Sequence, residues 1–165
     1  MPEQKIGKRA LKKMTKSSIA QAFMDAGLTH GDEVHIEDAS AGSVKYQNVK
    51  FIREKNQVVA AIYGSINHCA SIWLKEDAFS AVRPHLPDDA VVEDVAPFRR
   101  GFQWSIHIKS PSSPLIGVIA ENCVQFAKQR LEKTLARRQE DADREVRKAE
   151  RAKVKAETRR NWKEL

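Results

Sequence analysis

Two histidines and three aromatic residues are the side chains of this sequence that could form a pocket for a small ligand. The histidines are His68 and His107, the tryptophans near them in the chain are Trp73 and Trp104, and the remaining aromatic residue is Tyr46. Imidazole nitrogens set among aromatic rings suit a concave binding site. The alternative is that all five belong to a sheet, in which the rings pack together and the nitrogens bond to the backbone.

A second set of candidate residues is basic and lies toward the C-terminal end. Its members are spaced by seven, four, three, four and four residues, so a helix would place them on one stripe, with an aromatic residue following on the same stripe. The basic residues are Arg137, Arg144, Lys148, Arg151, Lys155 and Arg159, and the aromatic residue is Trp162. Such a stripe suits contacts with phosphates and with one base or surface. The alternative is a solvated helix with pairs of opposite charge four residues apart.

Arrangements of residues that carry out catalysis are incomplete in this sequence. Asp88 follows a proline, as the first acid of a magnesium-dependent nuclease motif does, but the segment His107-Ile108-Lys109 lacks the second carboxylate that would hold the ion. The sequence has no glycine-rich phosphate loop, no serine–histidine–acid motif and no Cys-x-x-Cys pair. We therefore predict that the protein is not an enzyme and has no catalytic residues, no metal site and no cofactor.

The positive charge of the chain is concentrated at its two ends. Of the net charge of +7, residues 1–27 carry +4, residues 28–133 carry −1 and residues 134–165 carry +4. A neutral body with basic ends suits a polyanionic partner such as nucleic acid or a nucleoprotein. The alternative is that the basic ends only keep the chain soluble.

Short apolar segments between residues 42 and 73 indicate the sheet that must position the candidate pocket. They lie near 49–52, 58–63 and 69–73, and the polar turns between them predict antiparallel strands joined by hairpins. Alternation predicts further strands at 34–36 and 103–108, with Trp104, Ile106 and Ile108 on one face. Residues 91–95 are predicted to be a short strand or a loop.

Helices are predicted on both sides of these strands in the chain. The hydroxyl side chains of Thr15, Ser17 and Ser18 predict the start of a first helix, and Gly27 predicts its end. A short helix is predicted from about residue 75 until the prolines at 84 and 87. A later helix is predicted to start near Leu115 and to cover one face of the sheet with an apolar stripe: Ile116, Ile119, Ala120, Cys123, Phe126, Ala127 and Leu131.

These elements predict three parts of the chain. Residues 1–16 are predicted to be a basic N-terminal tail or a frayed helix start, and an α+β domain is predicted at 17–135. A charged helical extension is predicted at 136–165, where large apolar residues become rare while Ala, Arg, Lys and Glu favour a helix. The predicted fold class is α+β: a single antiparallel sheet covered by helices on one face, with a long charged C-terminal helix.

The apolar segments and the cysteines also indicate in which cell compartment the protein is expected. None approaches the roughly 20 residues that cross a bilayer, and residues 1–16 lack the apolar region of a secretory signal. Cys69 and Cys123 each lie in an apolar segment and are expected to be free thiols in a reducing cytosol, with a disulfide as the alternative. We therefore expect a cytoplasmic protein that does not contact a membrane.

Residues 42–133 resemble the YdhG and YjbR group of small proteins, whose fold is called CyaY-like or frataxin-like. The matching features are the segment from Val44 to Phe51, the apolar strand at 58–63, His68 with Trp73, and the later strand at 104–108. The sequence departs from the group at Gln47 and Val49, where Gly and Pro are usual. The resemblance implies the fold, and for some frataxin-like members it implies iron binding.

Taken together, these patterns predict a binding module that contacts nucleic acid or a nucleoprotein through its basic extensions. One alternative is a small-ligand or iron-binding domain of the same fold. The acids available for iron are mixed with Lys and Arg, and they are Asp32, Glu33, Glu37, Asp38, Glu76 and Asp77. Another alternative is an adaptor whose C-terminal helix docks on a protein partner.

Overall fold

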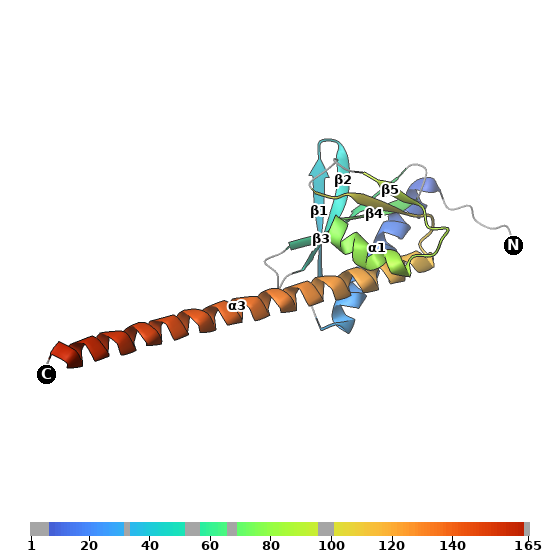
Figure 1. Cartoon of the computed structure of the whole chain (residues 1–165). Helices are drawn as coiled ribbons and strands as arrows, with labels where there is room; N and C mark the ends of the chain where they lie inside the picture. Colours follow the sequence, from blue (N-terminus) through green and yellow to red (C-terminus); the bar gives the residue numbers. More distant parts are fainter. Residues whose placement is uncertain (1–6, 32–33, 52–56, 66–68, 96–100, 164–165) are drawn as a thin grey trace. The chain divides into compact units, whose positions relative to one another are not determined.

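The computed structural model describes residues 7–31, 34–51, 57–65, 69–95 and 101–163, and it has an α+β fold (Figure 1). In chain order the elements are α1 (Lys8–Thr29), β1 (Val34–Ala41), β2 (Val44–Phe51), β3 (Gln57–Tyr63), β4 (Ala70–Leu74), α2 (Glu76–Val82), the 3-10 helix η2 (Arg83–His85), β5 (Val92–Asp94), β6 (Trp104–Ile108) and α3 (Pro114–Lys163). Residues 1–128 and 129–165 form two separate compact units, and each is described by itself below.

The described strands form one antiparallel sheet in the order β1-β2-β3-β4-β6-β5. Its central register aligns Ile62 of β3 with Ile72 of β4 and Ile106 of β6, and all three are fully buried. Because side chains of a strand alternate between faces, this row defines the face of the sheet that carries the main core. The predicted single antiparallel sheet is confirmed.

Helices of the first unit pack against this core face. Helix α1 contributes Ile19 and Phe23, α2 contributes Phe79, and the first turns of α3 contribute Ile119 and Cys123, all in one cluster of buried residues. The predicted cover of helices on one face of the sheet is therefore confirmed. Both cysteines are free; Cys123 is buried and Cys69 is half-buried.

Helix α1 differs from its prediction at both ends. It begins at Lys8 rather than at residues 15–18, so residues 8–16 agree with the alternative of a helix start and not with a tail, while residues 1–6 lie outside the described residues. Thr15 does not cap the helix: its buried hydroxyl donates to the carbonyl of Leu11 at 2.8 Å, within the helix. The helix also continues through Gly27 to Thr29, and Gly31, at φ +72°, supplies the left-handed residue after it.

The buried stripe of α3 is shifted slightly from its prediction. The buried residues are Ile116, Ile119, Ala120, Cys123, Val124, Ala127 and Leu131. Val124 therefore belongs to the stripe, whereas Phe126 is only half-buried at its edge, although it packs against the core. Spacing by three and four residues gathers the buried positions on one arc of the helix, and position 126 falls just beside that arc.

The second unit is the remainder of α3, residues 129–163. Every residue from 135 to 163 is exposed. Its helical structure therefore depends on the helix propensity of Ala, Arg, Lys and Glu and on contacts between neighbouring turns. One such contact joins the amide of Gln139 to the carboxylate of Asp143 at 3.0 Å.

Candidate nucleic-acid interface

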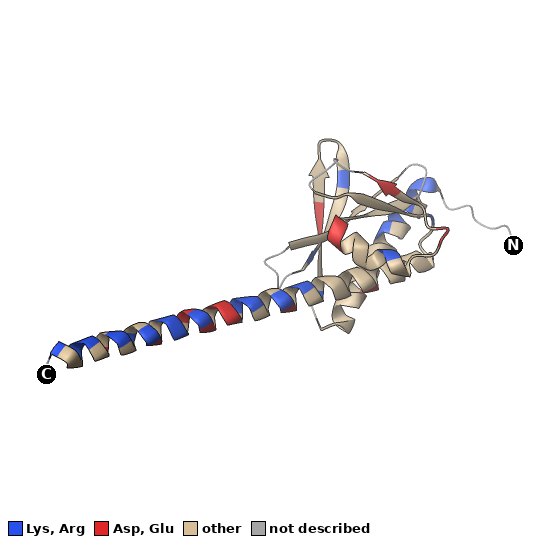
Figure 2. Cartoon of the chain, in the orientation of Figure 1, with Lys and Arg blue, Asp and Glu red and all other residues tan. Residues whose placement is uncertain are grey.

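The two halves of the second unit differ sharply in charge. Residues 129–143 contain four Lys/Arg and four Asp/Glu, whereas residues 144–163 contain nine Lys/Arg and three Asp/Glu, which leaves a net charge of +6. We call residues 144–163 the basic segment. Figure 2 shows acidic residues near the middle of α3 and basic residues along the part that follows. The excess charge is thus confined to the part of α3 that is exposed on every side.

Each residue of the predicted basic stripe lies on this exposed helix. Arg137 precedes the basic segment, and the other five, from Arg144 to Arg159, lie within it. Trp162 follows on the same stripe and is 75% exposed. The helix that the stripe requires is therefore present over its whole length.

Basic residues outside the predicted stripe widen the cationic surface. Arg147, Lys153, Arg160 and Lys163 are exposed and point to other sides of the same helix. Their positions around the helix could be predicted from the sequence, because they follow from the spacing of 3.6 residues per turn. The predicted stripe included only the residues on one line. The cations of the basic segment consequently cover about two-thirds of the circumference of the helix.

Three acidic residues of this region lie on a single narrow line, whereas Glu145 lies among the basic residues on the other side of the helix. Asp143, Glu150 and Glu157 are spaced by seven residues, or about two turns, and so follow one another along the helix. We call these three residues the acidic line. It occupies the part of the circumference that the basic residues leave open, so the helix has a broad cationic side and a narrow anionic side.

An ion pair within the basic segment is weak enough to leave its cation available. The ammonium of Lys148 lies 3.6 Å from the carboxylate of Glu145, with both side chains more than half exposed. Pairs of this kind contribute at most about 1 kcal/mol because water screens them. A phosphate can therefore replace Glu145 at Lys148 at little cost.

The described residues of the predicted pocket are divided between the two faces of the sheet. Tyr46 and Trp73 lie on the face of the sheet opposite the main core. Tyr46 stacks on Tyr63 with ring centroids 4.8 Å apart, and Trp73 packs against Tyr63 at 4.5 Å with its ring tilted. Trp104 lies on the core face, stacks on Phe79 at 4.5 Å, and donates its indole N–H to Glu76.

Of the two histidines of the predicted pocket, one lies among the described residues. His107 pairs in register with Ser71 and is buried on the same face as Trp73, with its Nε2 3.3 Å from a carboxylate oxygen of Glu93. His68 lies outside the described residues. The aromatic cluster therefore fills its own space: Tyr46 is 2% exposed and Tyr63 is 4% exposed.

Two concavities of the first unit are poorly suited to a small ligand. A cavity of about 190 Å³ beside His107 is lined by Asp89 and Lys109, among others, and it is smaller than the roughly 300 Å³ at which ligand pockets begin. A groove beside β2 is lined mainly by polar and charged residues, among them Lys16, Asp38 and Lys45, whereas most ligand pockets are lined mainly by hydrophobic and aromatic side chains. Within the described residues, no group of three or more His, Cys, Asp or Glu side chains is placed to hold a metal ion.

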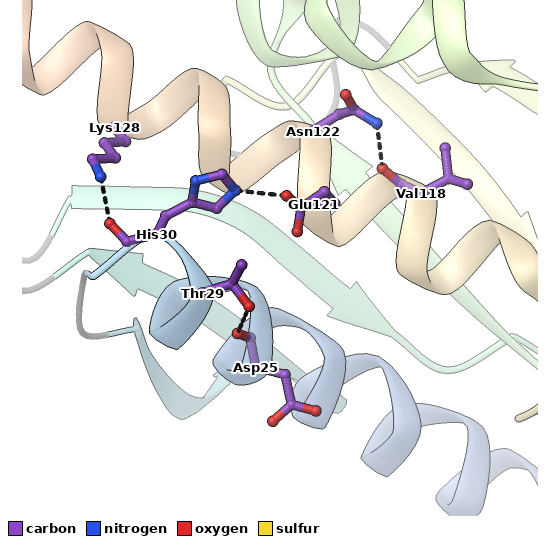
Figure 3. Close-up of polar contacts among 7 residues, drawn as sticks. All are labelled: Asp25, Thr29, His30, Val118, Glu121, Asn122 and Lys128. Carbon is purple, nitrogen blue, oxygen red and sulfur yellow. Dashed lines mark hydrogen bonds and ion pairs between the residues drawn. The ribbon is translucent and has the colours of Figure 1, made fainter.

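A polar joint fixes the part of α3 that precedes the second unit. In Figure 3, His30 at the end of α1 meets two residues of α3. Its Nε2 lies 2.7 Å from Oε1 of Glu121, and its carbonyl accepts a hydrogen bond from Lys128 Nζ at 2.5 Å. A cation at the free carbonyls of a helix end is favourable. The joint had no signal in the sequence, because its members are about ninety residues apart.

Comparison of the chain with protein-family models, with curated proteins and with solved structures found no match. Among the described residues, no helix is sufficiently long and apolar to cross a membrane.

Proposed function

We propose that this protein is a non-enzymatic module that binds nucleic acid or a nucleoprotein through the basic segment of α3. The observation that carries the proposal is a helix exposed on all sides with a net charge of +6 over residues 144–163. Phosphate contacts by Lys and Arg supply most of the affinity in such binding, because they release counterions from the polyanion. The Lys and Arg residues of α1 lie on an element that also packs into the core, and we assign them a smaller role.

Salt dependence of binding tests this proposal. The test variant replaces Arg151, Lys155 and Arg159 by Gln, and the control variant replaces Lys8, Arg9 and Lys13 of α1 by Gln. All six residues are exposed, and each variant lowers the net charge from +7 to +4. The two variants therefore remove the same amount of charge from different helices.

Affinity for DNA and RNA is measured for the full chain and both variants at several salt concentrations. The test variant is expected to flatten the slope of log K against log [salt] by about 0.7–0.9 for each lost phosphate contact. The control variant is expected to change the slope by less than the amount for one contact. Equal slopes for the two variants would mean that binding follows overall charge, and the proposal would fail.

A protein partner for α3 is the second candidate. Leu135, Val146 and Val154 are large apolar residues that lie exposed on the second unit, at 46%, 57% and 61%. Binding through such residues persists at high salt, whereas binding through phosphates weakens steeply. The same titration therefore separates the two candidates.

A further inference from the structure

We infer that the partner of the basic segment is double-stranded DNA, that α3 lies in its major groove, and that binding does not depend on base sequence; this inference rests on the proposed function. The first argument is one of size. An α-helix with its side chains is about 10–12 Å across, which matches the width of about 12 Å of the B-DNA major groove. Every residue of the basic segment is exposed, so its whole circumference is free to enter the groove.

The distribution of charge around the helix suits contact with two phosphate backbones rather than with one. Arg147 and Arg151 lie toward one flank of the basic segment, Lys153 and Arg160 toward the other, and the acidic line closes the circle behind them. A helix in the major groove has a phosphate backbone on each side and solvent behind it. This placement directs cations to both backbones and turns Asp143, Glu150 and Glu157 away from the DNA. Glu145 stays on the cationic side, where it lies 3.6 Å from Lys148.

Single strands and RNA duplexes fit this surface less well. Proteins that bind single strands stack successive bases on several aromatic side chains, and Trp162 is the single aromatic residue of the basic segment. An A-form RNA duplex has a deep, narrow major groove that side chains cannot read. The surface therefore favours B-form DNA over both.

The chemistry of the basic segment also favours contacts with the backbone over contacts with bases. Asn and Gln read adenine in the major groove, but Asn161, the one amide in this segment, falls on the side of the acidic line. The hydroxyl of Thr158 already donates to the carbonyl of Val154 at 2.9 Å. Binding through Lys and Arg to phosphate carries no sequence information of its own.

Competition between nucleic acids tests the inference with the full chain. Affinity is measured for 20-bp DNA duplexes of three unrelated sequences, for an RNA duplex and for single-stranded DNA of the same length. We expect the three DNA duplexes to agree within about threefold and each to bind at least about tenfold more tightly than the RNA duplex or the single strand. A compound bound in the minor groove should leave the affinity unchanged, and one bound in the major groove should abolish binding.

Paired charge reversals test the orientation of the helix. The variant with Arg151→Glu and Lys155→Glu lowers the net charge by four, and the variant with Glu150→Lys and Glu157→Lys raises it by four. With the acidic line facing solvent, the first variant should lose at least about a hundredfold in affinity, while the second gains less than about tenfold. Changes of equal size in opposite directions would show that orientation plays no part and would overturn the groove model.

The remaining outcomes separate this inference from the proposed function. Equal or tighter binding to the RNA duplex or the single strand, or displacement by the minor-groove compound, would overturn the inference and leave the proposed function standing. Absence of salt-dependent binding to every nucleic acid would overturn both.

Discussion

Ile119 and Phe126 lie on the same helix but differ in how deeply they are buried. Ile119 is fully buried in the core, whereas Phe126 is half-buried at the edge of the stripe. Ile119→Ala should therefore cost about 2–5 kcal/mol of unfolding free energy, since it leaves a closed cavity. Phe126→Ala should cost less than Ile119→Ala, although phenylalanine is the larger side chain. Urea unfolding of both variants checks this, and a larger loss for Phe126→Ala would show that the stripe is assigned incorrectly.

Side chains that act through long-range contacts were the hardest to place from the sequence. The charges of the basic segment could be predicted, because an exposed helix places its residues by spacing alone. The pairing of Trp104 with Phe79 and Glu76 could not, since it depends on how α2 crosses the sheet. The predicted pocket was assembled from residue types, and the alternation of β4 and β6 places its two tryptophans on opposite faces.

At the scale of elements, replacing either of two glycines by alanine is expected to change the stability of the protein, in opposite directions. Gly31 follows α1 at φ +72°, whereas Gly117 lies within α3, where an added Cβ would meet open space. Gly31→Ala should destabilise the protein by about 1–2 kcal/mol, because a side chain is strained in the left-handed region. Gly117→Ala should stabilise it by about 0.5–1 kcal/mol through helix propensity.

Thermal unfolding of the two glycine variants, each compared with the unmodified chain, gives the sign of each change directly. A stabilising Gly31→Ala would mean that α1 does not end in a left-handed turn. A destabilising Gly117→Ala would mean that the first turns of α3 are packed more tightly than the structure shows.

Strands and helices were predicted with unequal success for a physical reason. Alternation within β6 and the apolar segments of β3 and β4 are local signals, so the sheet could be predicted from short stretches of sequence. The ends of α1 could not, because Thr15 bonds within the helix instead of capping it and Gly27 is accepted inside the helix. Helix ends depend on which of several competing bonds forms, and spacing does not decide that.

At the scale of the whole molecule, the division into two units predicts that the first folds without most of the second. Residues 136–163 are exposed throughout, so removing residues 136–165 takes little apolar surface out of a buried environment. The shortened chain should unfold cooperatively, with a free energy of unfolding within about 1 kcal/mol of the full chain. Urea titration followed by tryptophan fluorescence measures this through Trp73 and Trp104. A loss of several kcal/mol would show that the first unit depends on the extension.

The exposure of the extension has a consequence for how its backbone exchanges hydrogen with solvent. Amides in the central strands, such as that of Ile72, are released only when the sheet itself opens. Amides beyond residue 135 are held by the helix alone, so they are released turn by turn as the helix frays from its C-terminal end. In deuterated water the backbone amides should therefore exchange in two widely separated time ranges, those of the extension first and those of the sheet much later. A bound polyanion would slow amide exchange in the extension and leave exchange in the sheet unchanged.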